Sequence, residues 1–208
     1  MELKEFTPAQ AAAVTGLSLA AVHKAIDTRL VRPRIAKARG NVRRFLSKEH
    51  LIYLQLEAEG LRLLPLPTRR EVAGMIQREP NIERVAVGGG DALRVEVKRA
   101  RRKVAVELQR LAKAEGMAIS NPEIMGGTPV FRGTRIPIQL VADMLAQGAS
   151  KDEILQGYPS LTQDRIELAP VYVQAFPRRG RPTRRPWAGQ RATRTTTYRL
   201  GQGHPRVA

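Results

Sequence analysis

The stretch NPEIMGGTPVFRGTRIPI, residues 121–138, carries the strongest local pattern of this 208-residue chain. Its glycines at 126, 127 and 133 permit positive φ without a Cβ penalty. Pro129–Arg132 is typical of a short strand and Arg135–Ile136 of its return. Pro137 suits the first turn of a helix, where its missing N–H costs nothing. The stretch therefore predicts a small β-element that feeds a helix. A purely structural hairpin stays open, because glycine and proline occur in turns everywhere.

The same stretch, extended to residue 167, resembles a small prokaryotic family long labelled a domain of unknown function. The resemblance rests on Gly-Gly-x-Pro, then Arg-Gly-Thr-Arg-Ile-Pro, then a Tyr-Pro-x-Leu-Thr turn. Members are similar to VapB-like antitoxins of type II toxin–antitoxin pairs, usually partnered with PIN-type ribonucleases. The resemblance covers about a quarter of the chain. It implies an antitoxin role, which no residue indicates by itself.

The composition is strongly basic and free of cysteine. A net charge of +17 and a pI near 11.3 indicate a polyanion or an acidic protein as partner. The absence of cysteine excludes disulfides and thiolate sites and is compatible with a cytoplasmic location. No apolar run approaches the roughly 20 residues that span a bilayer, and the N-terminus lacks a signal-peptide pattern. We therefore expect a cytoplasmic protein without a membrane partner.

Residues 1–60 predict a helix-turn-helix with a wing. Thr7 can cap a first helix, Gly16 permits the turn, and Ser18 can cap a second helix from Leu19 to Thr28. In such a motif the second helix lies in the major groove of DNA. An ordinary pair of packed helices stays open as the alternative. The positions expected to face outward on or next to this helix include Ser18, Ala20, Ala21, His23, Lys24 and Asp27.

The segment after this helix is basic and resembles the wing of MerR-like DNA-binding domains. Residues 29–44 contain seven Lys or Arg and no acid. In such domains two short strands reach across the DNA backbone, and basic residues touch phosphates. Ser47 is expected to cap a following helix from Lys48 to Leu56. The candidate DNA contacts are Ser18, His23 and Lys24 on the helix and Arg39, Arg43 and Arg44 on the wing.

Residues 61–118 predict a connector, a β-hairpin and a basic helix. Thr68 is expected to cap a helix over Arg69–Arg78. Apolar alternation on both sides of the glycines at 88–90 predicts a hairpin, and these glycines lack the lysine and the helix of a phosphate loop. A helix is predicted over Lys98–Glu115, and its first turns are basic. Two explanations for these basic residues stay open: they are a solvated face, or they bind an external anion. Its apolar stripe consists of Val104, Leu108, Leu111 and Ala112.

Residues 119–176 are expected to form the antitoxin-family domain, with three helices after the glycine-rich stretch. Ser150 begins a capping box for the middle helix, and Thr162 can cap the last one. Acidic residues on these helices favour a packing or dimerisation module over a DNA reader. Pro170 departs from the family pattern and predicts a kink or an early end of the last helix. The fold class that we expect is mainly α with small β elements (α+β).

Residues 177–208 form an Arg-rich tail for which disorder in the free protein is expected. From residue 171 onward the chain holds nine Arg and no acid. Pro177–Pro182 resembles an AT-hook, which places Arg in a narrow minor groove. The alternatives are a strap that binds an acidic partner and a solubilising tail without a partner. The candidate toxin contacts are Arg178, Arg179, Arg181, Arg184, Arg185 and Trp187.

No sequence feature supports catalysis. The three histidines lie on separate elements, and no phosphate loop, Gly-x-Ser-x-Gly or His-Glu-x-x-His is present. We therefore expect no enzyme, no metal and no cofactor. The favoured interpretation is a homodimeric antitoxin that binds a PIN-type ribonuclease toxin and represses its own operator DNA. The alternative is a free-standing MerR-like transcriptional regulator.

Overall fold

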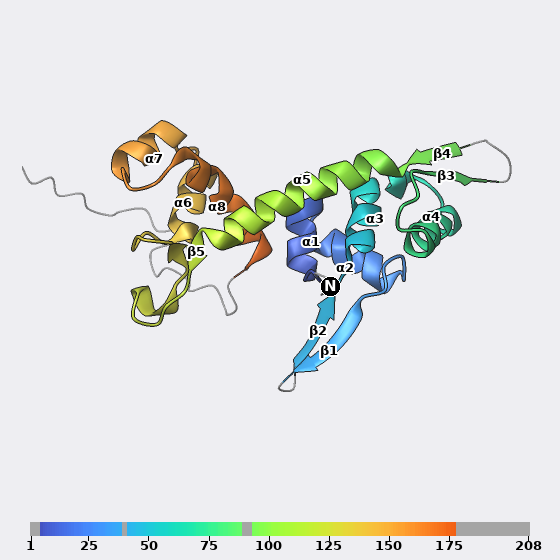
Figure 1. Cartoon of the computed structure of the whole chain (residues 1–208), viewed down its shortest axis with the longest axis horizontal. Coiled ribbons are helices and arrows are strands. Elements are labelled where there is room, and N and C mark those ends of the chain that lie inside the picture. The colour runs from blue at the N-terminus through green and yellow to red at the C-terminus, as the bar shows by residue number, and fades with distance from the viewer. Residues whose placement is uncertain (1–4, 39–40, 89–92, 178–208) are drawn as a thin grey trace, which may run out of the picture. The chain divides into compact units, whose positions relative to one another are not determined.

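The computed structural model describes residues 5–38, 41–88 and 93–177. Within these residues it contains eight α-helices and three two-stranded antiparallel sheets (Figure 1). The mainly helical fold with small β elements is therefore confirmed. Arg39 and the whole tail from Arg178 onward lie outside the described residues.

The first two helices form the helix-turn-helix that the sequence predicts. α1 (Pro8–Thr15) begins with a reciprocal capping box between Thr7 and Gln10. Gly16 ends it in the left-handed region, with φ 71°. α2 (Leu19–Asp27) is capped by Ser18, whose hydroxyl accepts a hydrogen bond from the Ala21 N–H at 3.2 Å. The apolar side chains Val14, Leu17, Val22 and Ile26 of this motif are all buried.

The predicted wing is a β-hairpin that leads into a buried helix. β1 (Arg34–Ala38) pairs with β2 (Asn41–Phe45), and a single bridge joins Phe6 to Leu46. α3 (Lys48–Ala58) follows its Ser47 cap, as expected. Every residue of α3 from His50 to Glu57 is buried. This helix therefore forms the centre of the N-terminal core.

The connector between α3 and the second hairpin differs from the prediction at its start. A 3₁₀ turn, η1 (Leu61–Leu63), precedes α4 (Leu66–Arg78). Thr68 does not cap this helix; the helix begins two residues earlier, with Pro65 as N-cap and Pro67 in its first turn. Proline fits there because its fixed φ suits the helix and the first N–H groups have no intrahelical partner.

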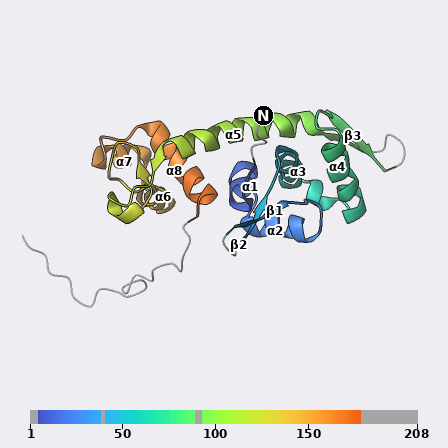
Figure 2. The same cartoon turned by 60° about the horizontal axis from the view of Figure 1, so that its bottom comes forward.

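The second hairpin and the long helix are confirmed. β3 (Arg84–Val87) pairs with β4 (Leu93–Glu96), and α5 (Val97–Gly116) follows directly. Val104 and Leu111 of the predicted stripe are buried, whereas Ala112 is exposed and Ala114 is buried in its place. α1, α3 and α8 cover this stripe within the chain (Figure 2). It is therefore not a free dimerisation surface.

The glycine-rich stretch forms a β-element with a further partner beside the one predicted. β6 (Val130–Phe131) pairs with β5 (Ala118–Ile119), which lies at the end of α5. The expected return over Arg135–Ile136 is no named strand, but the chain does return there: the Phe131 N–H donates to the Ile136 carbonyl at 3.0 Å, next to a bridge between Val130 and Pro137. Before β6, η2 (Met125–Gly127) is a tight turn. All three predicted glycines adopt positive φ, at Gly126, Gly127 and Gly133.

The three helices after this stretch are α6 (Ile138–Ala146), α7 (Lys151–Gly157) and α8 (Gln163–Ala175), with the predicted caps at Ser150 and Thr162. The expected early end at Pro170 is wrong, because α8 continues to Ala175. Pro170 is exposed, whereas Ile166, Ala169 and Ala175 are buried. Packing of α8 against α1, α5 and α6 offsets the about 3 kcal/mol that proline costs inside a helix.

Candidate nucleic-acid interface

The second helix presents a short polar face to solvent. Ser18, Ala20 and Lys24 are exposed, and His23 is half-buried. The opposite side, with Val22, Ala25 and Ile26, packs into the core. The structure therefore places the predicted base-contacting residues Ser18, His23 and Lys24 on or at the start of one helix whose other side is fixed.

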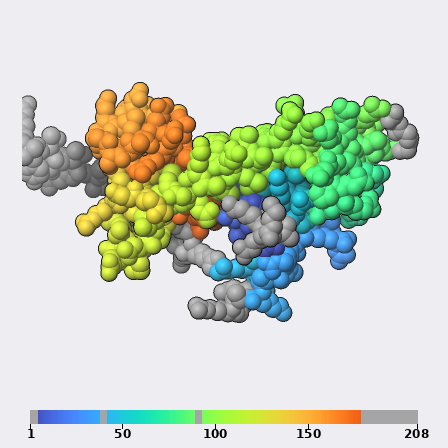
Figure 3. All heavy atoms as spheres, in the orientation of Figure 1, coloured from blue at the N-terminus to red at the C-terminus, as the bar shows by residue number. Residues whose placement is uncertain are grey.

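The hairpin β1–β2 projects beside this helix (Figures 1 and 3). Its strand register gives it two different faces. Residues directly opposite in an antiparallel pair lie on the same face. Ile35 pairs with Arg44 and Lys37 with Val42, so these four share one face. Arg43 pairs with Ala36 and lies on the other. Arg43 and Arg44, predicted to act together on phosphates, therefore point to opposite sides of the hairpin.

An ion pair connects the wing to α2. The Arg44 Nη1 atom lies 3.7 Å from the Asp27 Oδ1 atom, and both side chains are largely exposed. An exposed pair of this kind contributes little to stability. Its consequence is positional, because it holds the Arg44 guanidinium next to the end of α2. Sequence reasoning treated Asp27 as a helix-surface residue and missed this contact.

A second arginine of the wing, Arg34, forms an ion pair within the chain. Arg34 forms a two-pronged ion pair with Glu5, with its Nε atom 2.6 Å from the Glu5 Oε1 atom, and stacks over the Phe45 ring at 5.2 Å. The hydrogen bond from Arg34 lowers the pKa of the Glu5 carboxyl. Arg34 thus fixes the base of the hairpin to the N-terminal segment, and Arg43, Arg44 and Lys37 remain as its outward cations.

Exposed apolar residues accompany these cations on the wing. Ile35 is 58% exposed and Val42 is 61% exposed, on the same face as Lys37 and Arg44. Large aliphatic side chains are usually more buried. An apolar surface flanked by cations suits contact with sugar edges and phosphates of a duplex. The sequence carries no alternation that marks this face, because β2 has the sequence Asn-Val-Arg-Arg-Phe.

Several basic residues in the first turns of α5 form ion pairs or hydrogen bonds with groups of the same chain. The Lys98 Nζ atom lies 2.7 Å from the Glu83 Oε1 atom, and Lys103 lies 3.5 Å from Glu59. Arg101 donates to the backbone carbonyls of Pro80 and Ile82. These contacts favour a structural explanation for this run of charges over an external anion.

Several of the residues predicted to contact DNA or a toxin are not described by the structure. Arg39 and the tail residues Arg178, Arg179, Arg181, Arg184, Arg185 and Trp187 lie outside the described residues. Over the described ranges, no group of three or more His, Cys, Asp or Glu is placed to hold a metal ion. None of the helices in those ranges is long and apolar enough to cross a membrane.

Comparison with known proteins places one family within this chain. Residues 119–173 match the family described as "Protein of unknown function (DUF433)". This range begins at the strand β5 and ends within α8. It contains the whole Gly-Gly-x-Pro and Arg-Gly-Thr-Arg-Ile-Pro pattern that carries the family resemblance.

Two individual proteins are also similar. "Uncharacterized protein y4eO" from Sinorhizobium fredii is 47% identical over 74 residues, which is 36% of this chain and 34% of that protein. The chain therefore matches about a third of the length of this relative. The crystal structure of Rv2018 from Mycobacterium tuberculosis covers 79% of this chain and 95% of its own, at 14% identity and a TM-score of 0.35.

Proposed function

We propose that this protein is the antitoxin of a type II toxin–antitoxin pair, which binds operator DNA and neutralises a PIN-type ribonuclease. We call the two parts of this proposal, DNA binding and toxin neutralisation, its DNA half and its toxin half. The DNA half is supported by the position of α2 beside a basic wing. The toxin half is supported by the DUF433 match over residues 119–173 and by the resemblance of that motif to antitoxins.

The DNA half follows from shape and charge. A helix fixed on one side and polar on the other fits the major groove, where Lys24 and His23 reach base edges. Arg44, held beside the end of α2 by Asp27, then meets the flanking phosphates. Arg43 and Lys37 contact the backbone from the wing. Phosphate contacts of this kind make the affinity fall steeply with salt.

The toxin half assigns the neutralising contacts to the C-terminal tail. PIN-type nucleases gather carboxylates around a divalent metal, so their active-site cleft is negative. Guanidinium groups pair with carboxylates in two-pronged geometry and compete with metal or substrate phosphate. The residues proposed for this role are Arg178, Arg179, Arg181, Arg184 and Arg185, with Trp187 as an apolar anchor.

The proposed assembly is a homodimer, because two-fold proteins read two half-sites about 34–36 Å apart. α5 packs its apolar stripe within the chain, so the remaining candidates are the helices after Pro137. Among the residues of α6, Leu140 is 39% exposed. Sedimentation at tens of micromolar tests this assembly, and a monomer alone would contradict it.

Co-expression tests the toxin half. The protein encoded next to this one is expressed as the toxin, together with either the full chain or a chain truncated after Ala175. Protection by the full chain only supports the tail mechanism. Equal protection by both keeps the antitoxin function and removes the tail from it. No protection and no co-purification with the full chain overturn the toxin half.

The alternative function is a free-standing regulator of the MerR-like kind. The feature that favours it is that the wing and α2 lie in residues 18–45, outside the DUF433 range. The two functions make different predictions about the neighbouring reading frame. A small acidic protein with dispersed Asp and Glu favours the antitoxin, and its absence favours the regulator.

A further inference from the structure

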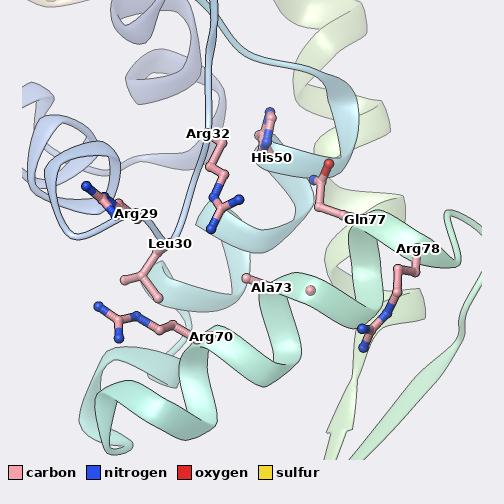
Figure 4. Close-up of a pocket in the computed structure, with 9 residues that line it drawn as sticks. Arg29, Leu30, Arg32, His50, Arg70, Ala73, Gln77 and Arg78 are labelled. Atoms are coloured by element: carbon pink, nitrogen blue, oxygen red, sulfur yellow. The ribbon is translucent and has the colours of Figure 1, made fainter.

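A second basic surface adjoins the end of α2 and the base of the wing hairpin, because Arg29 and Arg32 also line a hollow with Asp27 and Arg44. It is a cleft of about 640 Å³ between the segment that follows α2, the start of α3 and the helix α4 (Figure 4). Among the residues that the structure describes, no Asp or Glu lines it. We call this the four-arginine cleft. Its basic lining residues are Arg29, Arg32, His50, Arg70 and Arg78.

The arginines come from both walls of the four-arginine cleft. Arg29 and Arg32 belong to the segment after the recognition helix, and Arg70 and Arg78 belong to α4. Figure 4 shows the Arg32 side chain extending toward α4 above Ala73. All four arginines are exposed, so their guanidinium groups are accessible to a ligand. Four cations around one concave surface attract a multiply charged anion.

The position of α4, which forms one wall, is fixed from its other side. Arg69 donates two hydrogen bonds to the nearly buried Glu57 carboxylate of α3, at 2.8 and 2.7 Å. The Tyr53 hydroxyl donates to the same carboxylate. Arg70, the next residue, reaches the other wall, with its Nη2 atom 3.4 Å from the Thr28 carbonyl oxygen. The two adjacent arginines therefore have different roles: Arg69 holds α4 against α3, and Arg70 faces the cleft.

Two backbone features at the four-arginine cleft run against local preference. Arg29 has φ 60°, in the left-handed region that non-glycine residues rarely adopt, because it ends α2: the Arg29 N–H bonds to the Ile26 carbonyl at 2.9 Å and the Leu30 N–H to the Ala25 carbonyl at 3.0 Å. Gly74 lies in the interior of α4, where alanine is preferred. A Cβ atom at 74 would contact only Arg78, at 4.0 Å from its Nη2 atom. Alanine is therefore tolerated at this position, and because Gly74 lines the cleft a longer side chain placed there would occupy its floor.

His50 supplies a neutral donor at the edge of the same cleft. Its Nδ1 atom accepts a hydrogen bond from the Ser47 N–H at 3.0 Å, in the capping box of α3. Burial lowers the pKa of His50. The neutral ring that results carries its proton on Nε2 when Nδ1 accepts, so Nε2–H is a donor for a ligand oxygen.

We propose that the four-arginine cleft binds a phosphate group, supplied either by a free phosphate-bearing anion or by the DNA backbone. Guanidinium groups match phosphate oxygens in two-pronged geometry. Arg32 and Arg78 contact the phosphate from the two walls, and His50 donates a further hydrogen bond. The DNA source rests on the proposed function, whereas the free-anion source does not.

The test compares full-length variants that differ at this cleft. Arg32→Gln removes its central cation, and Arg102→Gln is the matched control, because Arg102 is an exposed arginine on α5 that does not line the cleft. Gly74→Glu places a carboxylate on the floor, and Gly74→Ala is its control. Circular dichroism first verifies that each variant is folded.

Two measurements distinguish the sources of the phosphate. Calorimetric titration with inorganic phosphate at constant ionic strength reports the free anion. We expect binding by the wild type and both controls, and about 10-fold weaker binding by Arg32→Gln and Gly74→Glu. Binding of duplex DNA over a salt series reports the backbone. If the phosphate belongs to DNA, the log–log slope of Arg32→Gln falls by about 0.9 and that of Arg102→Gln does not.

Each result decides one point. A difference in either measurement that is confined to the cleft variants supports the site and identifies its source. Equal behaviour of cleft and control variants in both measurements overturns it. DNA binding that is retained in that case leaves the proposed function intact. Phosphate binding without any DNA binding keeps the cleft and contradicts the DNA half of the proposed function.

Discussion

The winged unit, residues 5–60, and the DUF433 range, residues 119–173, are built on different principles. The winged unit surrounds α3, which is buried on all sides from His50 to Glu57. The DUF433 range is organised by backbone turns, with Gly126, Gly127 and Gly133 all at positive φ. Both regions bury apolar side chains, but in the DUF433 range three closely spaced glycines at positive φ also shape the turns around the buried Phe131.

Their charges differ as well. The segment 29–44 has seven bases and no acid, whereas residues 119–173 have six acids and four bases. The part that resembles a DNA-binding module is therefore not the part that matches the family. This separation means that the two proposed activities can be removed one at a time. Substitutions in either region test that independence, from the largest expected effect to the smallest.

The largest effect is expected in the core of the DUF433 range. Phe131 is fully buried and lies in β6. Phe131→Ala should lower the free energy of unfolding by about 3–5 kcal/mol, because it removes the ring and leaves a cavity. Denaturant titration measures this loss. Phe45→Ala on the half-buried base of the wing is the matched comparison and should cost clearly less.

The next effect concerns DNA affinity and is specific to the winged unit. Arg43→Glu with Arg44→Glu should weaken duplex binding by about 10- to 100-fold for all sequences alike, because phosphate contacts carry no base information. Arg135→Glu, at an exposed arginine in the DUF433 range, is the control. Fluorescence anisotropy at several salt concentrations gives the affinities. Because the control reverses one charge and the test variant two, an equal loss per reversed charge would show that only net charge matters.

A smaller effect is expected at the glycines of the motif. Gly133 has φ 81°, and a Cβ atom added there would meet open space, so strain rather than a clash opposes substitution. Gly133→Ala should therefore cost about 1–2 kcal/mol of stability. Gly157→Ala, at the end of α7, has equal space and no positive φ, and should be neutral or slightly stabilising. Thermal melting compares the two variants, and equal melting temperatures would contradict the assignment of strain.

The smallest effect is a pH dependence in the winged unit. The pKa of His50 lies below its ordinary value of 6.5 in the folded chain, first because of burial. The unfolded chain then binds the proton more tightly, so the contribution of His50 is fully present above pH 6.5 and is lost as the pH falls through the lowered folded pKa. Denaturant titrations between about pH 5 and 7 should show this decrease, and His50→Gln should reduce it. An unchanged slope in that variant would assign the decrease to other groups.

Much of the local structure follows from the sequence because its causes are local. Thr7, Ser18, Ser47, Ser150 and Thr162 cap the helices that they were predicted to cap. A capping hydroxyl reaches N–H groups only two or three residues away, so neighbouring residues suffice to predict it. The predicted contacts Ser18, His23, Lys24 and Arg44 are also gathered around α2.

Other features depended on contacts between distant segments. β6 pairs with β5 in addition to its bridge to Pro137, and α8 passes through Pro170 because buried side chains on its other faces hold it. The four-arginine cleft joins Arg29 and Arg32 to Arg70 and Arg78, and neither pair alone indicates a site. The sequence by itself determined the turns, the caps and the hairpins, whose energies arise within a few residues. Only the tertiary structure decided which strand pairs with which and which cations meet, because those energies depend on packing between segments far apart in the chain.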